Sequence, residues 1–294
     1  MPSLQYGTGT LGIVDRSIDL LGATIKCMLV TPSYTYDADH DYVSDVVAAE
    51  LSGTGYAAGF SGAGRKTLAS KTLALNGGST RVEFDAADVS WTALAAAAGT
   101  IGGAILYQEG TSDADSRLIA FLDPDDLVPN GSDVTLSWNS GGILYWTVPT
   151  GVYPTGWLQI LNRTINLAGG TIKAALAGTG YTFSAAHVDM ADVTELATGT
   201  GYAGGFSGAG RKTLGSKTIT NDTANNRIEF GFANPVWTAI DAGTIGGVLI
   251  YANGTADSDS ILIAFDNTTD RATNGGDMTY TVNAEGLLQW SYAS

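Results

Sequence analysis

The sequence has little cysteine and histidine, and this shortage excludes two kinds of covalent or metal support. Of the 294 residues, one is cysteine and two are histidine. A single cysteine excludes a disulfide within the chain, and these three residues cannot complete a structural zinc site. Cys27 lies in the alternating segment TIKCMLVT, which favours a buried thiol that packs as a small apolar residue.

Basic residues are also scarce. The chain carries 14 lysines and arginines against 29 acidic residues, so its formal net charge is −15. A nucleic-acid-binding protein needs a basic surface to replace the counterions of the phosphates. We therefore expect no nucleic-acid partner.

Long apolar runs are missing as well. No stretch approaches the roughly 20 apolar residues that a membrane-spanning helix needs. The first residues, MPSLQYGTGTLGIVDRS, contain no basic region followed by an apolar run, so no secretory signal is expected. We expect a protein made in a cytoplasm, with no membrane partner.

What the sequence does contain is an internal repeat. GTGYAAGFSGAGRKTLASKTL at 53–73 returns as GTGYAGGFSGAGRKTLGSKTI at 199–219. GTIGGAILY at 99–107 returns as GTIGGVLIY at 243–251, and further matches follow in the same order. A colinear repeat of this length indicates two whole domains rather than a solenoid. We predict a first domain at 1–148 that begins with a short N-terminal arm, a Pro/Gly linker at 149–156 and a second domain at 157–294.

The local patterns within each unit are mostly those of strands. ATIKCMLV and TRVEFDA alternate with period two, and short apolar runs elsewhere are bounded by Gly, Asp and Asn. The predicted fold class is mainly β: two tandem homologous antiparallel β-sandwiches or flattened barrels. Trp91 and Trp237 hold equivalent positions and are expected in the core.

One or two short helices are expected in each unit. In DADHDYVSDVVAAEL, at 37–51, Asp41 is the expected cap of a helix with apolar residues near helical spacing. The matching segment of the second unit is weaker, and WTALAAAAG at 91–99 predicts another short helical piece. Pro149 and Pro154 are expected to stop regular structure at the join.

The stretch GFSGAGRKT at 59–67 is close to a phosphate-binding loop but fails its requirements. Arg65 stands where the motif needs lysine, and Lys66 and Thr67 come one place late. The residues that follow favour a strand, whereas the phosphate would need a helix N-terminus. The sequence therefore favours a glycine-rich turn.

That turn carries much of the positive charge of an acidic chain. One hypothesis is a solvated loop that repeats with its domain, and the other is a docking surface for an acidic partner. The candidate docking residues are Arg65, Lys66, Lys71, Arg211, Lys212 and Lys217.

No other motif predicts catalysis or a cofactor. The acidic turns at Asp113/Asp115 and Asp257/Asp259 favour turn chemistry, with a bound cation as the open alternative. His40 and His187 match in position, but neither a nucleophile elbow nor a catalytic triad accompanies them. We expect no enzyme activity, no cofactor and no metal site.

The order of several segments resembles virion structural proteins of tailed bacteriophages. These segments are IDLLGATIKCMLV, DYVSDV, GRKTLASKT, FDAADVSWTAL with GTIGGAILY, and SRLIAFLD with NGSDVTLSWNSGGIL, from Ile18 to Leu144. The second unit resembles the same proteins more loosely, from Ile165 to Leu288. Those relatives look like single units, so a tandem pair departs from their pattern.

The resemblance implies a non-enzymatic virion component made in the bacterial host cytoplasm. Its expected role is to decorate or reinforce the capsid by docking on the major capsid protein, as a homo-oligomer or in many copies on a lattice. A neck, tail or fibre component and a module that binds host glycans are the alternatives.

Overall fold

The fold is mainly β, with several antiparallel sheets and few short helices, which confirms the predicted class. The computed structural model describes residues 3–199, 201–240, 243–267 and 271–292. The strands of the first half are β1 (Ser3–Gln5), β2 (Ile25–Val30), β3 (Lys66–Thr67), β4 (Thr72–Asn76), β5 (Arg81–Asp85), β6 (Val89–Trp91), β7 (Gly103–Gln108), β8 (Arg117–Leu122), β9 (Val134–Leu136) and β10 (Leu144–Thr147). Its helices are α1 (Gly7–Val14), α2 (Val43–Val46) and the 3₁₀ turns η1 (Val47–Ala49) and η2 (Ala96–Ala98).

The second half begins with helix α3 (Pro154–Leu161). Its strands are β11 (Ile172–Gly178), β12 (Lys212–Thr213), β13 (Thr218–Asp222), β14 (Arg227–Gly231), β15 (Val236–Trp237), β16 (Gly243–Ala252), β17 (Ile261–Asp266), β18 (Arg271–Thr273), β19 (Met278–Thr279) and β20 (Leu288–Ser291). The turns η3 (Met190–Asp192) and η4 (Asp257–Asp259) complete it.

The two halves also pair their strands in the same order. The first has a sheet β1-β8-β7-β2-β3 and a smaller sheet β10-β5-β4. The second has β12-β11-β16-β17, with β18 also on β16, and the smaller sheet β13-β14-β20. Val152 forms a bridge to Ala264 of β17, in the place that β1 takes beside β8. The domain boundaries themselves stay a prediction.

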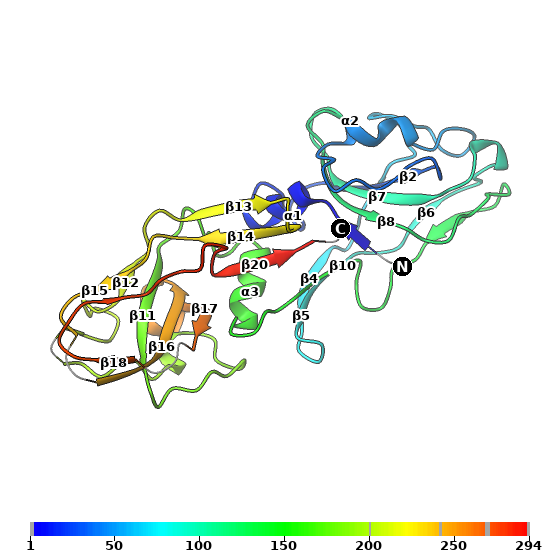
Figure 1. Ribbon diagram of the computed structural model, residues 1–294. Helices are drawn as coiled ribbons and strands as arrows, with labels where there is room; N and C mark the ends of the chain where they lie inside the picture. The colour runs from blue at the N-terminus through cyan, green and yellow to red at the C-terminus, as the bar shows by residue number, and fades with distance from the viewer. Residues whose placement is uncertain (1–2, 200, 241–242, 268–270, 293–294) are drawn as a thin grey trace.

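The molecule is elongated, with a lobe at each end and a shared centre (Figure 1). One lobe contains β2, β7 and β8 beneath α2, and the other contains β11, β16 and β17. The centre contains both smaller sheets and the helices α1 and α3. Each half therefore contributes its larger sheet to its own lobe and its three-stranded sheet to the middle of the molecule.

In the centre the halves exchange helices. Helix α1 of the first half packs against β13 and β14 of the second, while α3 of the second half packs against β4 and β5 of the first. The two helices also contact each other. This exchange places the predicted linker inside the fold, because residues 154–156 form the first turn of α3.

Both of these helices differ from the sequence expectation. Pro154 starts α3 at its first turn and does not stop regular structure there. A proline suits this position because the first amide of a helix has no partner within the helix. The short N-terminal arm expected before β2 contains α1, whose glycines allow close approach: a Cβ at Gly9 would lie 2.6 Å from the Leu118 carbonyl oxygen.

One apolar core runs through the centre and into both lobes. It joins Ile13 of α1 and Val82 of β5 with Trp157 of α3 and Trp290 of β20, all of them buried. The rings of Trp157 and Trp290 stack with their centroids 4.6 Å apart. Burial of this kind is the main stabilising term in folding, so the halves stabilise each other.

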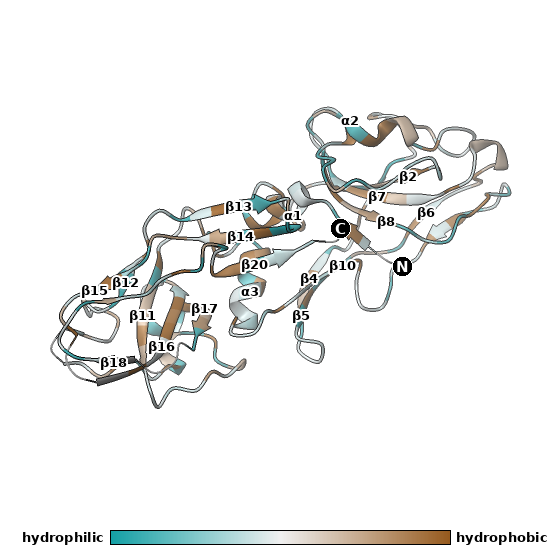
Figure 2. Cartoon of the chain, viewed as in Figure 1, coloured by the Kyte–Doolittle hydropathy of each residue, from teal (hydrophilic) through white to brown (hydrophobic). Residues whose placement is uncertain are grey.

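The lobe sheets are covered on both faces, which explains the continuous apolar runs of their strands. In β2, Cys27 and Leu29 face the central core, whereas Met28 and Val30 face a second cluster beneath α2. Strands buried on both faces lose the polar alternation of a half-exposed sheet. The hydropathy colouring shows the apolar stretches along β8 and β16 (Figure 2).

The remaining local predictions are partly confirmed. Trp91 and Trp237 are fully buried, Cys27 is buried, and the predicted helical piece near WTALAAAAG is η2. The helix predicted at 37–51 is only α2 followed by η1, and Asp41 is not its cap. Instead Asp45 accepts hydrogen bonds from the amides of Asp41 and Tyr42, at 3.0 and 2.9 Å.

Candidate functional site: the glycine-rich loops and their ion pairs

The glycine-rich stretch at 59–67 is a turn that leads into strand β3, as the sequence predicts. Strand β3 pairs with β2 through Lys66 and Cys27. The structure therefore provides no helix N-terminus behind this loop to hold a phosphate. The second copy leads in the same way into β12, where Lys212 pairs with Ala174 of β11.

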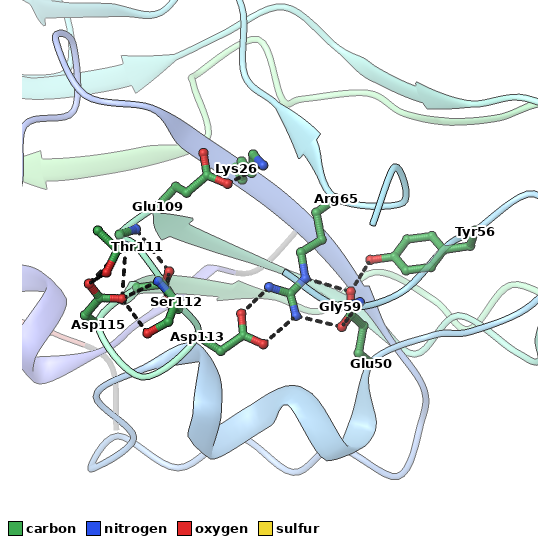
Figure 3. Close-up of polar contacts among 12 residues, drawn as sticks. Lys26, Glu50, Tyr56, Gly59, Arg65, Glu109, Thr111, Ser112, Asp113 and Asp115 are labelled. Atoms are coloured by element: carbon green, nitrogen blue, oxygen red, sulfur yellow. Dashed lines mark hydrogen bonds and ion pairs between the residues drawn. The ribbon is translucent and has the colours of Figure 1, made fainter. Parts of the chain in front are cut away.

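Arg65 lies inside the fold, between two carboxylates. Its Nε and Nη2 donate to the two oxygens of Glu50 at 2.8 and 2.7 Å, and its Nη1 and Nη2 donate to Asp113 at 2.5 and 3.2 Å. Figure 3 shows the guanidinium between these two acids. The Arg65 side chain is fully buried and that of Glu50 is 2% exposed. This bidentate geometry is the strongest form of such a pair.

The Glu50 carboxylate also accepts hydrogen bonds from other residues of the loop. It accepts hydrogen bonds from the Tyr56 hydroxyl at 3.2 Å and from the Gly59 amide at 3.0 Å. The Tyr56 hydroxyl in turn accepts from the amide of Leu29 on β2, at 3.1 Å. One carboxylate therefore ties the loop, an aromatic ring and the sheet together.

The second half repeats this network with its own residues. Arg211 donates from Nε and Nη2 to Glu195 at 3.1 and 2.9 Å and also pairs with Asp257. Tyr202 donates to Glu195, and the Gly205 amide donates to the same side chain at 2.7 Å. Both arginines lie over an aromatic ring of the sheet, 5.7 Å from the Tyr107 centroid and 5.5 Å from that of Tyr251.

The glycines of the motif allow this close packing. A Cβ at Gly64 would lie 2.6 Å from the Tyr56 ring, and one at Gly62 would lie 2.1 Å from the Ala57 carbonyl oxygen. The Gly64 carbonyl accepts a hydrogen bond from Trp91 Nε1 at 2.6 Å. The motif is therefore specified by packing and by a buried ion pair.

The electrostatics of the site favour charged arginines. Burial alone would lower the pKa of Arg65, but hydrogen bonds from its guanidinium to Glu50 and Asp113 raise that pKa above its usual value. The same causes raise the pKa of Arg211. Burial dominates at Tyr251 and raises its pKa to about 12, although Arg211 opposes the shift. These groups stay in one protonation state near neutral pH, so none is suited to proton transfer.

The six basic residues proposed for docking therefore divide into two groups. Arg65 and Arg211 are buried and paired within the chain, which corrects the expectation that they belong to a positive surface loop. The four lysines are half-buried; Lys71 donates to the Ala23 carbonyl, and Lys217 donates to the Leu214 carbonyl at 3.5 Å. A docking surface would have to use Lys66, Lys71, Lys212 and Lys217.

The acidic turns are used within the fold. Asp113 pairs with Arg65, while Asp115 accepts hydrogen bonds from the amides and hydroxyls of Thr111 and Ser112, with the Thr111 hydroxyl at 2.6 Å. Asp257 and Asp259 do the same in the second half. Within the described ranges, no three His, Cys, Asp or Glu side chains are grouped so that they could hold a metal ion.

Each histidine ends a short chain of hydrogen-bonded tyrosines. The hydroxyls of Tyr6 and Tyr34 are 2.6 Å apart, and Tyr34 contacts His40 Nδ1 at 3.2 Å. In the second half Tyr153, Tyr181 and His187 repeat this chain, at 2.6 and 2.9 Å. Neither chain includes a nucleophile or an acid in a triad arrangement.

Sequence reasoning missed Glu50 and Glu195, the residues on which both networks depend. A signal was available, because each lies in a Glu-Leu pair shortly before GTGY in both copies of the repeat. A buried arginine needs a carboxylate, and Glu50 and Glu195 recur with the two arginines in both copies.

Comparison with known proteins adds no relative. No family model matches the sequence, and neither a curated protein nor a solved structure matches it. The described residues form no helix that is long and apolar enough to cross a membrane.

The ion pair gives a direct prediction. Replacing Arg65 with Met leaves the Glu50 carboxylate buried without its partner, and we expect a loss of roughly 3–5 kcal/mol in the free energy of unfolding. Chemical denaturation measures this loss. The double variant Arg65→Met, Glu50→Gln should recover part of it, and Lys66→Ser should change stability by less than about 0.5 kcal/mol. Equal losses of stability for Arg65→Met and Lys66→Ser would contradict the claim that Arg65 forms a stabilising buried ion pair.

The hydrogen bonds of the acidic turns predict how the free energy of unfolding depends on pH. Hydrogen bonds from Thr111, then Ser112, lower the pKa of Asp115, and those from Thr255, then Ala256, lower the pKa of Asp259. A carboxyl with a lowered folded pKa stabilises the fold above its unfolded pKa, about 3.9, and loses that contribution as pH falls through the folded value. Denaturation between neutral pH and pH 2 should show this acid loss. The double variant Asp115→Asn, Asp259→Asn should lose less stability as pH falls. If its free energy of unfolding falls with pH as steeply as that of the unmodified protein, these two carboxylates are not the source of the acid loss.

Proposed function

We propose that the protein is a non-enzymatic structural component of a tailed-bacteriophage particle that decorates or reinforces the capsid shell. The observation that carries the proposal is the exchange of helices α1 and α3 between the halves. It fixes two similar units in one orientation, so the chain can present two similar faces to a repeating lattice. Two linked weak contacts bind far more tightly than either alone when their spacing matches the lattice.

The polar residues of the site support a structural role. Arg65 and Arg211, the most strongly paired cations, hold loops inside their lobes. The segments that resemble phage virion proteins coincide with these packed loops and the strands around them.

Occupancy of the particle tests the proposal. We expect a reconstruction of particles from the phage that encodes the chain to show elongated two-lobed density over the capsid, repeated with the lattice. Particles from a deletion mutant should lack this density and serve as the control. Density at the neck, tail or fibres alone would contradict the capsid role, and absence from the particle would contradict the whole proposal.

A further inference from the structure

A groove of about 660 Å³ lies where the two halves meet, along strands β10 and β20. Both halves contribute to it, and α3 supplies part of its floor. The lining residues are Ser3, Gln5, Tyr145, Trp146, Thr147, Pro149, Trp157, Gln289, Trp290 and Ser291. Its volume is within the range of ligand-binding clefts.

Three strands that border the groove are the edges of their sheets. Strand β1 ends the five-stranded sheet of the first half, and β10 and β20 each end a three-stranded sheet. An edge strand presents backbone N–H and C=O groups that its own sheet does not pair. The carbonyl of Tyr145 on β10 has only a 3.5 Å contact from the Gln5 amide.

These edges lack the usual protection against pairing with another chain. Strands β3 and β12 are two residues long and carry Lys66 and Lys212, while β4 and β13 are covered by α3 and α1. In contrast, β10 reads LYWT and β20 reads LQWS, without charge or proline. Among the described residues, no charged side chain lines the groove, although the net charge of the chain is −15. Unprotected edges of this kind are pairing sites.

The floor contains hydrogen-bond donors that have no acceptor. The indole Nε1 atoms of Trp146, Trp157 and Trp290 are buried, and none has a partner among the described residues. These three side chains are at most 4% exposed. Elsewhere Trp91 and Trp237 donate to the carbonyls of Gly64 and Gly210. These indole rings give the groove an aromatic floor, and their Nε1 atoms are covered by the surrounding side chains and do not open into the groove.

We propose that this groove binds an extended peptide segment of another polypeptide, which adds as a strand to the free edges of β10 and β20. The backbone N–H and C=O groups of the peptide pair with those of the strand edges, and alternate side chains of an added strand point to the aromatic floor and to solvent. Four paired residues span roughly 13 Å. A neutral oligosaccharide would also suit the amides and hydroxyls of the rim, but only a peptide repeats the N–H and C=O spacing of a strand edge.

Selection of short random peptides against the full chain tests the binding mode. We expect enriched peptides that change the tryptophan fluorescence, and whose affinity falls by roughly tenfold or more when alternate backbone amides are N-methylated. Peptides that tolerate methylation at every position would overturn the proposal, as would a selection that enriches none. Neutral oligosaccharides that bind in the groove on a glycan array would overturn it in favour of a sugar site.

Lysine substitutions locate the site. Thr147→Lys with Ser291→Lys places charges on the exposed positions of β10 and β20, as Lys66 and Lys212 do on β3 and β12. This variant should lose peptide binding by roughly tenfold or more, because charge on an edge opposes pairing. The matched control, Thr72→Lys with Thr220→Lys, makes the same charge change on exposed residues of β4 and β13. Equal affinity of the two variants would overturn the assignment to this groove.

Discussion

The packing of each N-terminal helix on the sheet of the other half is the constraint on which the architecture depends. Helix α1 covers β13 and β14, and α3 covers β4 and β5. A sheet with an apolar face must bury that face against the surface of another element. Each smaller sheet obtains that surface from the other half, so the orientation of the two lobes follows from the core itself. A flexible linker would leave both sheets uncovered.

The polar networks have a more local task, which is to hold long loops onto the lobe sheets. Glu50 forms a backbone bridge to Val30 of β2, and its carboxylate holds the loop that follows. The bidentate pair with Arg65 and the bond from Tyr56 meet at that carboxylate. This explains why a sequence that resembles a phosphate-binding loop recurs unchanged: both copies need the same glycines for close approach and the same arginine for the ion pair.

The sequence predicted the strands well because their residues alternate or run apolar between turn signals. Strands β2, β5 and β14 lie where the patterns place them. The glycine-rich stretch at 59–67 leads into a strand, as predicted. Helices α1 and α3 were missed because a short arm was expected before β2 and Pro154 was expected to stop regular structure. Only tertiary packing shows that the glycines of these helices permit contact with a neighbouring sheet. Two of the six docking residues, Arg65 and Arg211, are buried, since a basic side chain next to glycines gives no sign of burial until its acids are found elsewhere in the chain.

This arrangement suits a building block that offers two similar units and a groove at their junction, as proposed for a component of a particle. Its central claim is that the halves share one core, and native-state hydrogen exchange tests that claim with one variant. Trp157 belongs to the second half, yet α3 covers β4 and β5 of the first. Replacing Trp157 with Ala should therefore speed amide exchange in β4–β5 as well as in β13–β14. Faster exchange confined to the second half would contradict the shared core.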